Sequence, residues 1–188
     1  DGAGKATQTA LLVDHLRAHG IKVGVISFPR YEETPAGKML FEYMKSDRRN
    51  DYNFAEMNPR AASYIYAKDR HESLSFLQSL IDQNEVVIFD RYVESNLLHQ
   101  GGKFESQAEQ MEFAKWICDL EYRFHGLPQI ELTIYLDLPY TISSERSRRR
   151  AEEKGGSADA VESNLNYLKN SWQAGKIYAI WFNWYVVD

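Results

Sequence analysis

The chain begins with residues that can bind phosphate. Asp1 to Lys5 read DGAGK, the second half of a phosphate-binding loop. Glycines in such a loop let backbone N–H groups close around phosphate oxygens, and the lysine reaches the β- and γ-phosphates of a nucleotide. The next position, usually a Ser or Thr that binds Mg²⁺, is Ala6. The structural alternative is an ordinary glycine-rich segment at the start of a helix. Phosphate binding is favoured because the motif begins a helix and alternating strands come after that helix, as a phosphate-binding loop requires.

A second set of polar residues follows a hydrophobic segment. Asp90 and Arg91 come directly after Val86–Phe89. Ligands of open parallel sheets bind beyond the carboxyl ends of the strands. There the acid can hold Mg²⁺ through water and the arginine can grip a phosphate bidentately. A structural ion pair at a strand end is the competing interpretation.

An arginine cluster lies later in the chain. Four arginines fall within five residues, and the glycine pair Gly155 and Gly156 follows them. A solvated helix face is the ordinary explanation. A flexible break beside arginines is also what a closing lid needs, since arginines stabilise a transferring phosphoryl group and closure excludes water. The arginines are Arg146, Arg148, Arg149 and Arg150.

Two further features are less specific. The segment from Phe28 to Tyr31 ends a strand with a cation and a phenol near the same sheet edge, although a plain turn also explains it. On one long helix, spacings of three and four relate Tyr64, Tyr66, Asp69 and Arg70, so an aromatic there could stack on a base while Arg70 donates to its edge. Core packing is the alternative for these aromatics.

These residues need a parallel sheet to position them. Short apolar strands alternate with helices, which predicts an α/β fold with helices on both faces of a parallel sheet. Strands are expected at Val23–Phe28, Val86–Phe89, Leu132–Leu136 and Tyr185–Val187. Helices are expected at Lys5–His19, Thr34–Met44, Pro59–Gln83, Tyr92–Gln100, Ser106–Phe124, Thr141–Glu153 and Asp159–Phe182.

Length and composition fit one domain. The 188 residues are 44% hydrophobic and carry a net charge of −5, which argues against a general nucleic-acid binder. No apolar run reaches the roughly 20 residues that span a bilayer. The single Cys118 excludes an internal disulfide and favours the cytoplasm. Because a phosphate loop normally follows the first strand, we expect a longer protein in which a strand precedes Asp1 and a helix follows the last strand.

In this order, the motifs resemble the thymidylate kinase family, which transfers the γ-phosphate of ATP to dTMP. The resemblance runs along nearly the whole chain and implies a P-loop NTPase fold of three layers with an arginine-rich lid at about residues 145–160. Its segments are DGAGK, Phe28 to Tyr31, Asp69-Arg70, Asp90 to Tyr92 with Ser95 and Asn96, Gln100 to Gly102, Gly126 to Pro128, Glu145 to Arg148, and Asp159 with Glu162.

The resemblance implies roles for these residues. The ATP phosphates are expected on Gly2, Ala3, Gly4, Lys5, Thr7 and Arg146. The dTMP pocket is expected to contain Phe28, Tyr31, Tyr66, Arg70, Arg91, Asn96, His99, Gln100, Asp159 and Glu162. Tyr31 and Arg91 would hold the phosphate, Tyr66 would stack on the base and Arg70 would read thymine O4. Mg²⁺ is expected near Asp1 and Asp90, partly through water, and the family suggests a homodimer.

The origin of the catalytic arginine follows from the same resemblance. One branch of the family has an arginine directly after the loop aspartate, where this chain has Gly2. The other branch, the bacterial type, supplies it from the lid, which favours Arg149 or Arg150 here. Lys5, Asp1 and Arg91 complete the expected catalytic set. His99 stands where the family has Tyr or Phe near the sugar, which leaves the choice between deoxyribose and ribose open.

Two other functions stay open on the sequence alone. The first is a related kinase that acts on another nucleoside monophosphate or on a deoxynucleoside, and a panel of acceptors separates it. The second is a non-catalytic nucleotide-binding protein, suggested by Ala6, which would bind ATP without phosphoryl transfer. The arginine lid, for which a mere binding module has little use, counts against the second function.

Overall fold

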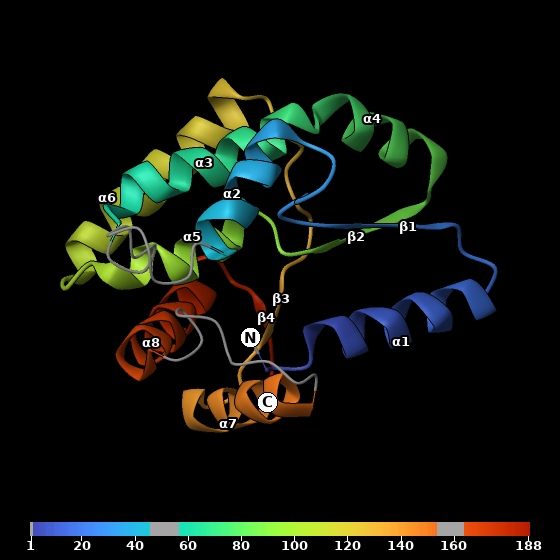
Figure 1. The fold of residues 1–188 in the computed structure, drawn as a ribbon. Helices are drawn as coiled ribbons and strands as arrows, with labels where there is room; N and C mark the ends of the chain where they lie inside the picture. Colours follow the sequence, from blue (N-terminus) through green and yellow to red (C-terminus); the bar gives the residue numbers. More distant parts are fainter. Residues whose placement is uncertain (1, 46–56, 154–163) are drawn as a thin grey trace.

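The computed structural model describes residues 2–45, 57–153 and 164–188 (Figure 1). Helices and short parallel strands alternate, so the expected α/β class is confirmed. The elements are α1 Lys5–Ala18, β1 Val23–Ser27, α2 Pro35–Lys45, α3 Pro59–Glu72, α4 Leu74–Gln83, β2 Val86–Asp90, α5 Val93–His99, the 3₁₀ turn η1 Gly101–Lys103, α6 Gln107–Cys118, the π-helical turn η2 Asp119–Phe124, β3 Ile134–Leu136, α7 Tyr140–Glu153, α8 Leu165–Trp181 and β4 Tyr185–Val187.

The described strands form two parallel pairs instead of the single sheet that the alternation predicted. β1 pairs with β2 and β3 pairs with β4. In the first pair Ser27 lies opposite Asp90, so both strands end at the same edge. This register brings the loop after β1 next to Asp90 and Arg91, and the backbone N–H of Phe28 donates to the carbonyl oxygen of Asp90 at 3.1 Å.

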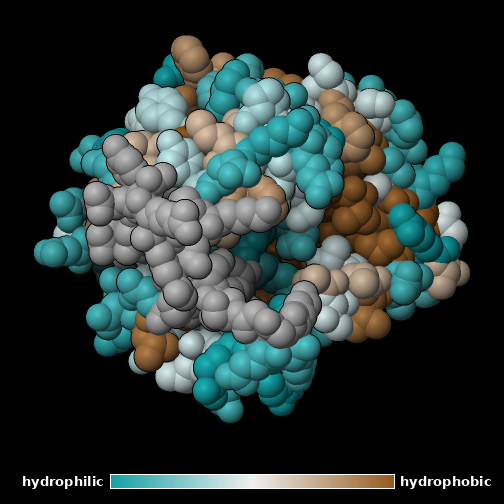
Figure 2. Space-filling view, viewed as in Figure 1, coloured by the Kyte–Doolittle hydropathy of each residue, from teal (hydrophilic) through white to brown (hydrophobic). Residues whose placement is uncertain are grey.

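Helices cover the first strand pair on opposite sides. α4 lies above β1 and β2 in Figure 1, α1 lies below them, and both helices contact the two strands. Figure 2 shows apolar surface between α1 and this pair, where Leu11, Leu12 and Val25 are among the exposed hydrophobic residues. No helix in the described ranges is both long and apolar enough to cross a membrane.

The main core lies among the helices around α5. Leu97, Phe113, Ile117 and Tyr178 are fully or almost fully buried there. α8 packs on both α5 and η1. The contact between η1 and α8 is so close that a side chain at Gly101 would collide with the ring of Tyr178. The segment after His99 is therefore fixed against α8.

The single helix predicted over Pro59–Gln83 is wrong. Its start is confirmed, since Asn58 caps α3 and Pro59 occupies its first turn. The helix breaks at Ser73, whose hydroxyl group donates to the carbonyl oxygen of Asp69 at 2.9 Å and accepts a bond from Arg30 at 3.3 Å. Side-chain bonds of serine to the backbone compete with the helical pattern. The apolar periodicity continues across Ser73, so the sequence pattern did not reveal the break.

Candidate active site

The N-terminal loop has the backbone that close approach to phosphate requires. Gly2 and Gly4 adopt left-handed conformations with φ of +76° and +85°. Gly4 is the N-cap of α1, and no acidic residue lies in the first turn. The first N–H groups of a helix lack intrahelical partners, and the helix dipole adds partial positive charge there. The start of α1, with Lys5 as its first residue, can therefore accept an anion.

Gly2 lies directly against the first turn of α7. A Cβ atom at this position would overlap the backbone carbonyl of Ser143, and the left-handed φ disfavours a side chain independently. The sequence had assigned this glycine to the phosphate loop alone. The tertiary contact adds that no larger residue fits between the loop and α7.

The end of β2 presents Arg91 to the same region. Arg91 has φ of +68°, a conformation that non-glycine residues rarely adopt. Its Nη1 donates to Nε2 of His99 on α5 at 3.2 Å. Burial, the charge of Arg91 and the charges of Lys5 and Lys103 together hold the pKa of His99 well below its ordinary value. The loop lysine, the strand-end arginine and His99 therefore share one electrostatic environment.

A buried network surrounds Arg70. Its Nε and Nη2 atoms donate to the two carboxylate oxygens of Glu121 at 2.5 and 2.6 Å, and the side chains are only 3% and 0% exposed. Burial alone lowers the pKa of Arg70, but the Glu121 carboxylate more than offsets this and leaves that pKa raised. Nδ2 of Asn96 donates to the same carboxylate at 3.3 Å. Arg70 and Asn96, both expected in the dTMP pocket, are thus held by the same carboxylate.

Gln100 completes this side of the site. Its side chain is 1% exposed, and among the described residues its Oε1 has no hydrogen-bond partner. A buried acceptor without a partner costs free energy unless a ligand or water satisfies it. The amide oxygen therefore suits a donor on a bound molecule. Phe28, 2% exposed, packs in the core against Tyr92 with ring centroids 5.9 Å apart.

The two predicted tyrosines share a second apolar cluster. Tyr31 and Tyr66 both pack against the cluster of Leu40 and Ala62. The hydroxyl group of Tyr31 donates to Sδ of Met44 at 3.2 Å. α2 and α3 contact each other here. Tyr64, by contrast, is 52% exposed and meets Trp116 edge-on, so it lies outside this cluster.

Asp69 anchors the loop that carries Tyr31. Its carboxylate accepts bonds from the hydroxyl group of Thr34 and, at 3.0 Å, from the backbone N–H of Arg30. Desolvation by burial raises the pKa of Asp69, although these bonds oppose the shift. The Arg30 guanidinium lies over the Phe76 ring at 4.4 Å. Asp69 thereby fixes this loop against α3.

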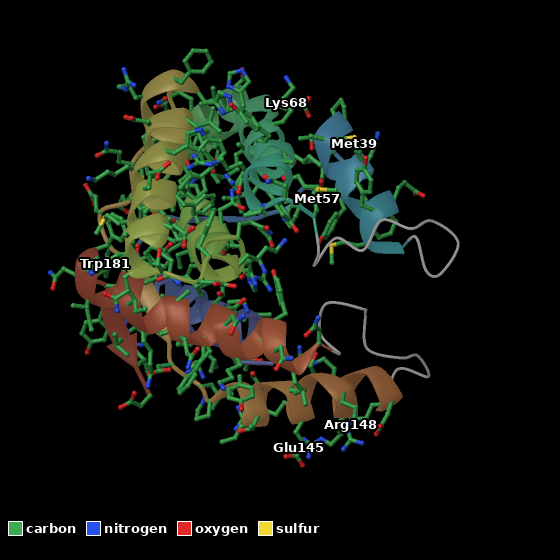
Figure 3. All side chains as sticks on the ribbon, turned by 90° about the vertical axis from the view of Figure 1, so that its left-hand side faces the viewer. Met39, Met57, Lys68, Glu145, Arg148 and Trp181 are labelled. Carbon is green, nitrogen blue, oxygen red and sulfur yellow. The ribbon has the colours of Figure 1, made fainter. Side chains whose placement is uncertain are left out.

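The arginines of α7 lie on different faces of an exposed helix. Arg148 and Arg149 form ion pairs of 3.7 and 3.5 Å with Glu152 and Glu153, one turn further on. Figure 3 shows Glu145 and Arg148 on the side of α7 that is turned away from the other elements. A residue two positions from Arg148 lies about 200° around the helix. Arg150 therefore projects from the opposite side.

Several predicted residues cannot be placed. Asp1, Asp159 and Glu162 lie outside the described residues, as does the lid beyond residue 153. Ala3 lies in the loop before α1, Thr7 lies in the first turn of α1, and Arg146 is exposed on α7. Residues 2–45, 57–153 and 164–188 contain no cluster of three potential metal ligands. A single carboxylate such as that of Asp90 can still serve Mg²⁺, because this ion takes one or two protein carboxylates and keeps waters and phosphate oxygens as further ligands.

Three residues of the site were not predicted from the sequence. Glu121 was hidden in an amphipathic helical pattern, where an acid is ordinarily solvent-facing. Tyr167 stacks on His99 from α8, with rings 5.9 Å apart and tilted by 10°, but the two are distant in sequence. Ser143 contacts Gly2 through its backbone, so its residue type carries no signal.

The chain was compared with known proteins. The model of the family described as "Thymidylate kinase" matches residues 1–187. A thymidylate kinase of Mycobacterium tuberculosis (strain H37Rv) is 30% identical over 158 residues, which are 84% of this chain and 72% of that protein. One of Exiguobacterium sp. is 27% identical over 87% of this chain and 69% of its own length. A probable thymidylate kinase of Thermococcus kodakarensis is 31% identical over 80% of this chain and 68% of its own length.

Proposed function

This chain belongs to the thymidylate kinase family, and we propose that it transfers the γ-phosphoryl group of ATP to dTMP, giving ADP and dTDP for dTTP synthesis. The observation that carries the proposal is the convergence on His99. Lys5 of the loop and Arg91 at the strand end both act on the charge of this one side chain. A cation for the donor phosphates and a cation for the acceptor phosphate therefore both act on His99.

The protein contributes positioning and charge neutralisation. A phosphate oxygen of dTMP attacks the γ-phosphorus in line, and the bond between that phosphorus and the ADP oxygen breaks. The acceptor phosphate is already anionic at neutral pH, so no strong general base is required. Lys5 and the N–H groups at the start of α1, with Gly2, Ala3, Gly4 and Thr7, hold the ATP phosphates. Bound Mg²⁺ neutralises phosphate charge, and Asp90 and Asp1 would hold it, partly through water.

We assign the dTMP pocket to α3 and the segments that pack against it. Tyr31 and Arg91 hold the acceptor phosphate, Tyr66 stacks on the base, and Asn96, Gln100 and Arg70 line its edge. The Glu121 pair uses two N–H groups of Arg70, and the Tyr92 carbonyl oxygen accepts a third from Nη1 at 3.5 Å. The other two N–H groups of the guanidinium can donate to thymine O4. Phe28, His99, Asp159 and Glu162 complete the proposed pocket.

The lid supplies the catalytic arginine in this proposal. An arginine at position 2 does not fit against Ser143, which supports the bacterial type with lid arginines. Of the two candidates, Arg149 pairs with Glu153, and Arg150 lies about 200° around α7 from Arg148. Arg150 is therefore our choice for the transferring phosphoryl group, with Arg146 one turn before it on the ATP phosphates.

The broader organisation is proposed on the same basis. We propose a single P-loop nucleoside monophosphate kinase domain with three layers and a lid at about residues 145–160. A homodimer built on the helices that flank the nucleotide site is proposed from the family. A cytoplasmic location is proposed as well, and the single thiol Cys118 supports it.

An acceptor panel tests the proposed activity. ADP formation from Mg-ATP is followed with dTMP, dUMP, dCMP and thymidine as alternative acceptors. We expect dTMP to give the highest kcat/KM, and Lys5→Ala to abolish turnover while the fold persists. A higher kcat/KM with another acceptor would support the related kinase, and ATP binding without transfer would support the non-catalytic protein.

The role of Arg70 needs a paired design. Arg70→Ala alone leaves Glu121 charged, buried and unpaired, so lost activity could reflect unfolding. Arg70→Met combined with Glu121→Gln removes both charges together. We expect this double variant, judged folded by its far-UV circular dichroism, to lose its preference for dTMP over dCMP. An unchanged preference would remove Arg70 from the base-reading set.

A further inference from the structure

His99 is placed to control the orientation of Arg91. Its Nε2 lies 3.2 Å from Nη1 of Arg91. A guanidinium group only donates hydrogen bonds, so Nε2 of His99 is the acceptor. A neutral imidazole that accepts at Nε2 carries its proton on Nδ1. The contact therefore fixes both the protonation state and the tautomer of His99.

The imidazole ring is held from a second element. The Tyr167 ring on α8 stacks on it nearly in parallel, tilted by 10° with centroids 5.9 Å apart. α8 also packs directly against α5, which carries His99. Because two elements fix the ring, Nε2 offers a stationary acceptor to the guanidinium.

The surroundings keep this acceptor in its neutral form. Burial is the main cause that lowers the pKa of His99, and the charge of Arg91 is the largest contribution among the described side chains. Lys5 on α1 and Lys103 on η1 add to the effect. A protonated ring could not accept a bond from Arg91. The contact is therefore maintained at neutral pH.

The backbone of Arg91 is also consistent with a functional constraint. Its φ of +68° is unfavourable for a side chain of this size, and such strain persists where surrounding structure fixes it. The strained residue directly follows β2, at the sheet edge where ligands bind. The backbone of Arg91 therefore fixes the direction of its side chain, and Nε2 of His99 fixes the position of its guanidinium group.

We propose that His99 is a positioning residue for the acceptor phosphate: it accepts one N–H of Arg91 and thereby aims the other N–H groups of that guanidinium at the phosphate of dTMP. The inference rests on the proposed function, because it takes the ligand of Arg91 to be dTMP. It differs from a role at the sugar, since His99 here acts through Arg91. A phenylalanine at this position keeps an aromatic ring but has no acceptor.

A double-mutant cycle tests whether His99 acts through Arg91. The affinity of dTMP is measured by calorimetry for the wild type, His99→Phe, Arg91→Ala and the double variant, each checked for folding by its urea midpoint. We expect His99→Phe to raise the Kd of dTMP about tenfold, as loss of one hydrogen bond to a charged group predicts, and to leave the Kd of ATP unchanged. In the Arg91→Ala background it should have no further effect. The same tenfold factor in both backgrounds would overturn the proposal, because His99 would then act on dTMP directly.

A second measurement does not depend on dTMP. Long-range ¹H–¹⁵N correlation spectra of the wild type report which nitrogen of His99 carries the proton. We expect the neutral tautomer with the proton on Nδ1 from pH 6.5 to 8, and a proton on Nε2 would overturn the Arg91 contact. If the wild type does not phosphorylate dTMP, the proposed function fails while this test still decides the contact. If it does and the cycle is additive, only the positioning role fails.

Discussion

Arg70 and Glu121 form a fully buried ion pair in which two N–H groups of the guanidinium meet both carboxylate oxygens, at 2.5 and 2.6 Å. The pair joins α3 to the turn after α6, elements that are 51 positions apart at this contact. Asn96 of α5 donates to the same carboxylate. One acidic side chain therefore holds two predicted base-pocket residues, and this relationship sets the first prediction.

Glu121→Ala should destabilise the fold strongly. Removing one partner of a buried pair leaves the other charge uncompensated, which typically costs about 3–5 kcal/mol. Urea denaturation measures the free energy of unfolding. Arg123→Ala is the matched control, because its ion pair with Asp119 is highly exposed and should contribute less than about 1 kcal/mol. Equal losses for both variants would contradict the burial argument.

Gly2→Ala should weaken both the fold and ATP binding. Gly20→Ala isolates the cost of a left-handed residue, about 1–2 kcal/mol, because Gly20 has φ of +80° and open space around it. Gly2→Ala adds the collision with the Ser143 carbonyl. We expect a lower urea midpoint and a weaker ATP Kd for Gly2→Ala than for Gly20→Ala. If the two variants had the same urea midpoint and the same Kd for ATP, the loop and α7 would separate without a cost in free energy.

Arg150→Ala should reduce the chemical step. Loss of one group that stabilises transition-state charge typically lowers kcat about 10²–10³-fold. The KM for dTMP should change little, because Arg150 is assigned to the transferring group. Arg148→Ala is the control from the opposite side of α7, and Arg149→Ala tests the other candidate. A larger loss of kcat in Arg149→Ala would reverse the assignment.

Ala6→Ser should lower the Mg²⁺ concentration that half-saturates the kinase. The hydroxyl group would replace one water ligand, and we expect a shift of about threefold or more. Ala6 lies in the exposed first turn of α1, so the substitution needs no repacking. Ala10→Ser, on the same helix and also exposed, controls for the helix propensity of serine. The idea that Ala6 weakens metal binding is wrong if the two variants have the same Mg²⁺ dependence.

Lys103 should make stability rise with pH. Burial lowers the pKa of Lys103 to about 8 in the folded state, while the unfolded chain keeps the ordinary 10.5. Between these values the unfolded state binds more protons, so the free energy of unfolding increases as the pH rises from about 8 to 10.5. Lys103→Met removes this group, and the difference in urea midpoint between wild type and variant should change over that window. If the urea midpoints of wild type and variant changed in parallel with pH, a lowered pKa of Lys103 would be excluded.

Buried tyrosines make this comparison with the variant necessary. Burial raises the pKa of Tyr92 and of Tyr178 far above 10. A group whose folded pKa is raised stabilises the fold below its unfolded pKa, and this stabilisation is lost as the pH climbs. The tyrosines thus oppose the effect of Lys103 at high pH. Subtracting the profile of the variant cancels their contribution.

Local patterns determined the elements and the likeness to a family. The helix from Lys5, the start of the helix at Pro59 and the last strand at Tyr185 follow from periodicity and caps, because these signals act over a few neighbouring residues. The ordered motifs also predicted the thymidylate kinase family, which the match over residues 1–187 confirms. Periodicity did not predict the break at Ser73, because an interaction with Arg30, distant in sequence, contributes to it.

The sequence by itself determined which residues can bind phosphate, since glycine, lysine and arginine carry that chemistry wherever they stand. Only the tertiary structure decided how these side chains are held. Glu121 forms an ion pair with Arg70, and His99 accepts a hydrogen bond from Arg91. The first turn of α7 packs against Gly2, and all of these contacts join elements that are distant in the chain. Such contacts depend on packing and burial, which fix the neutral state of His99 and the pairing of Arg70, and no local spacing encodes them.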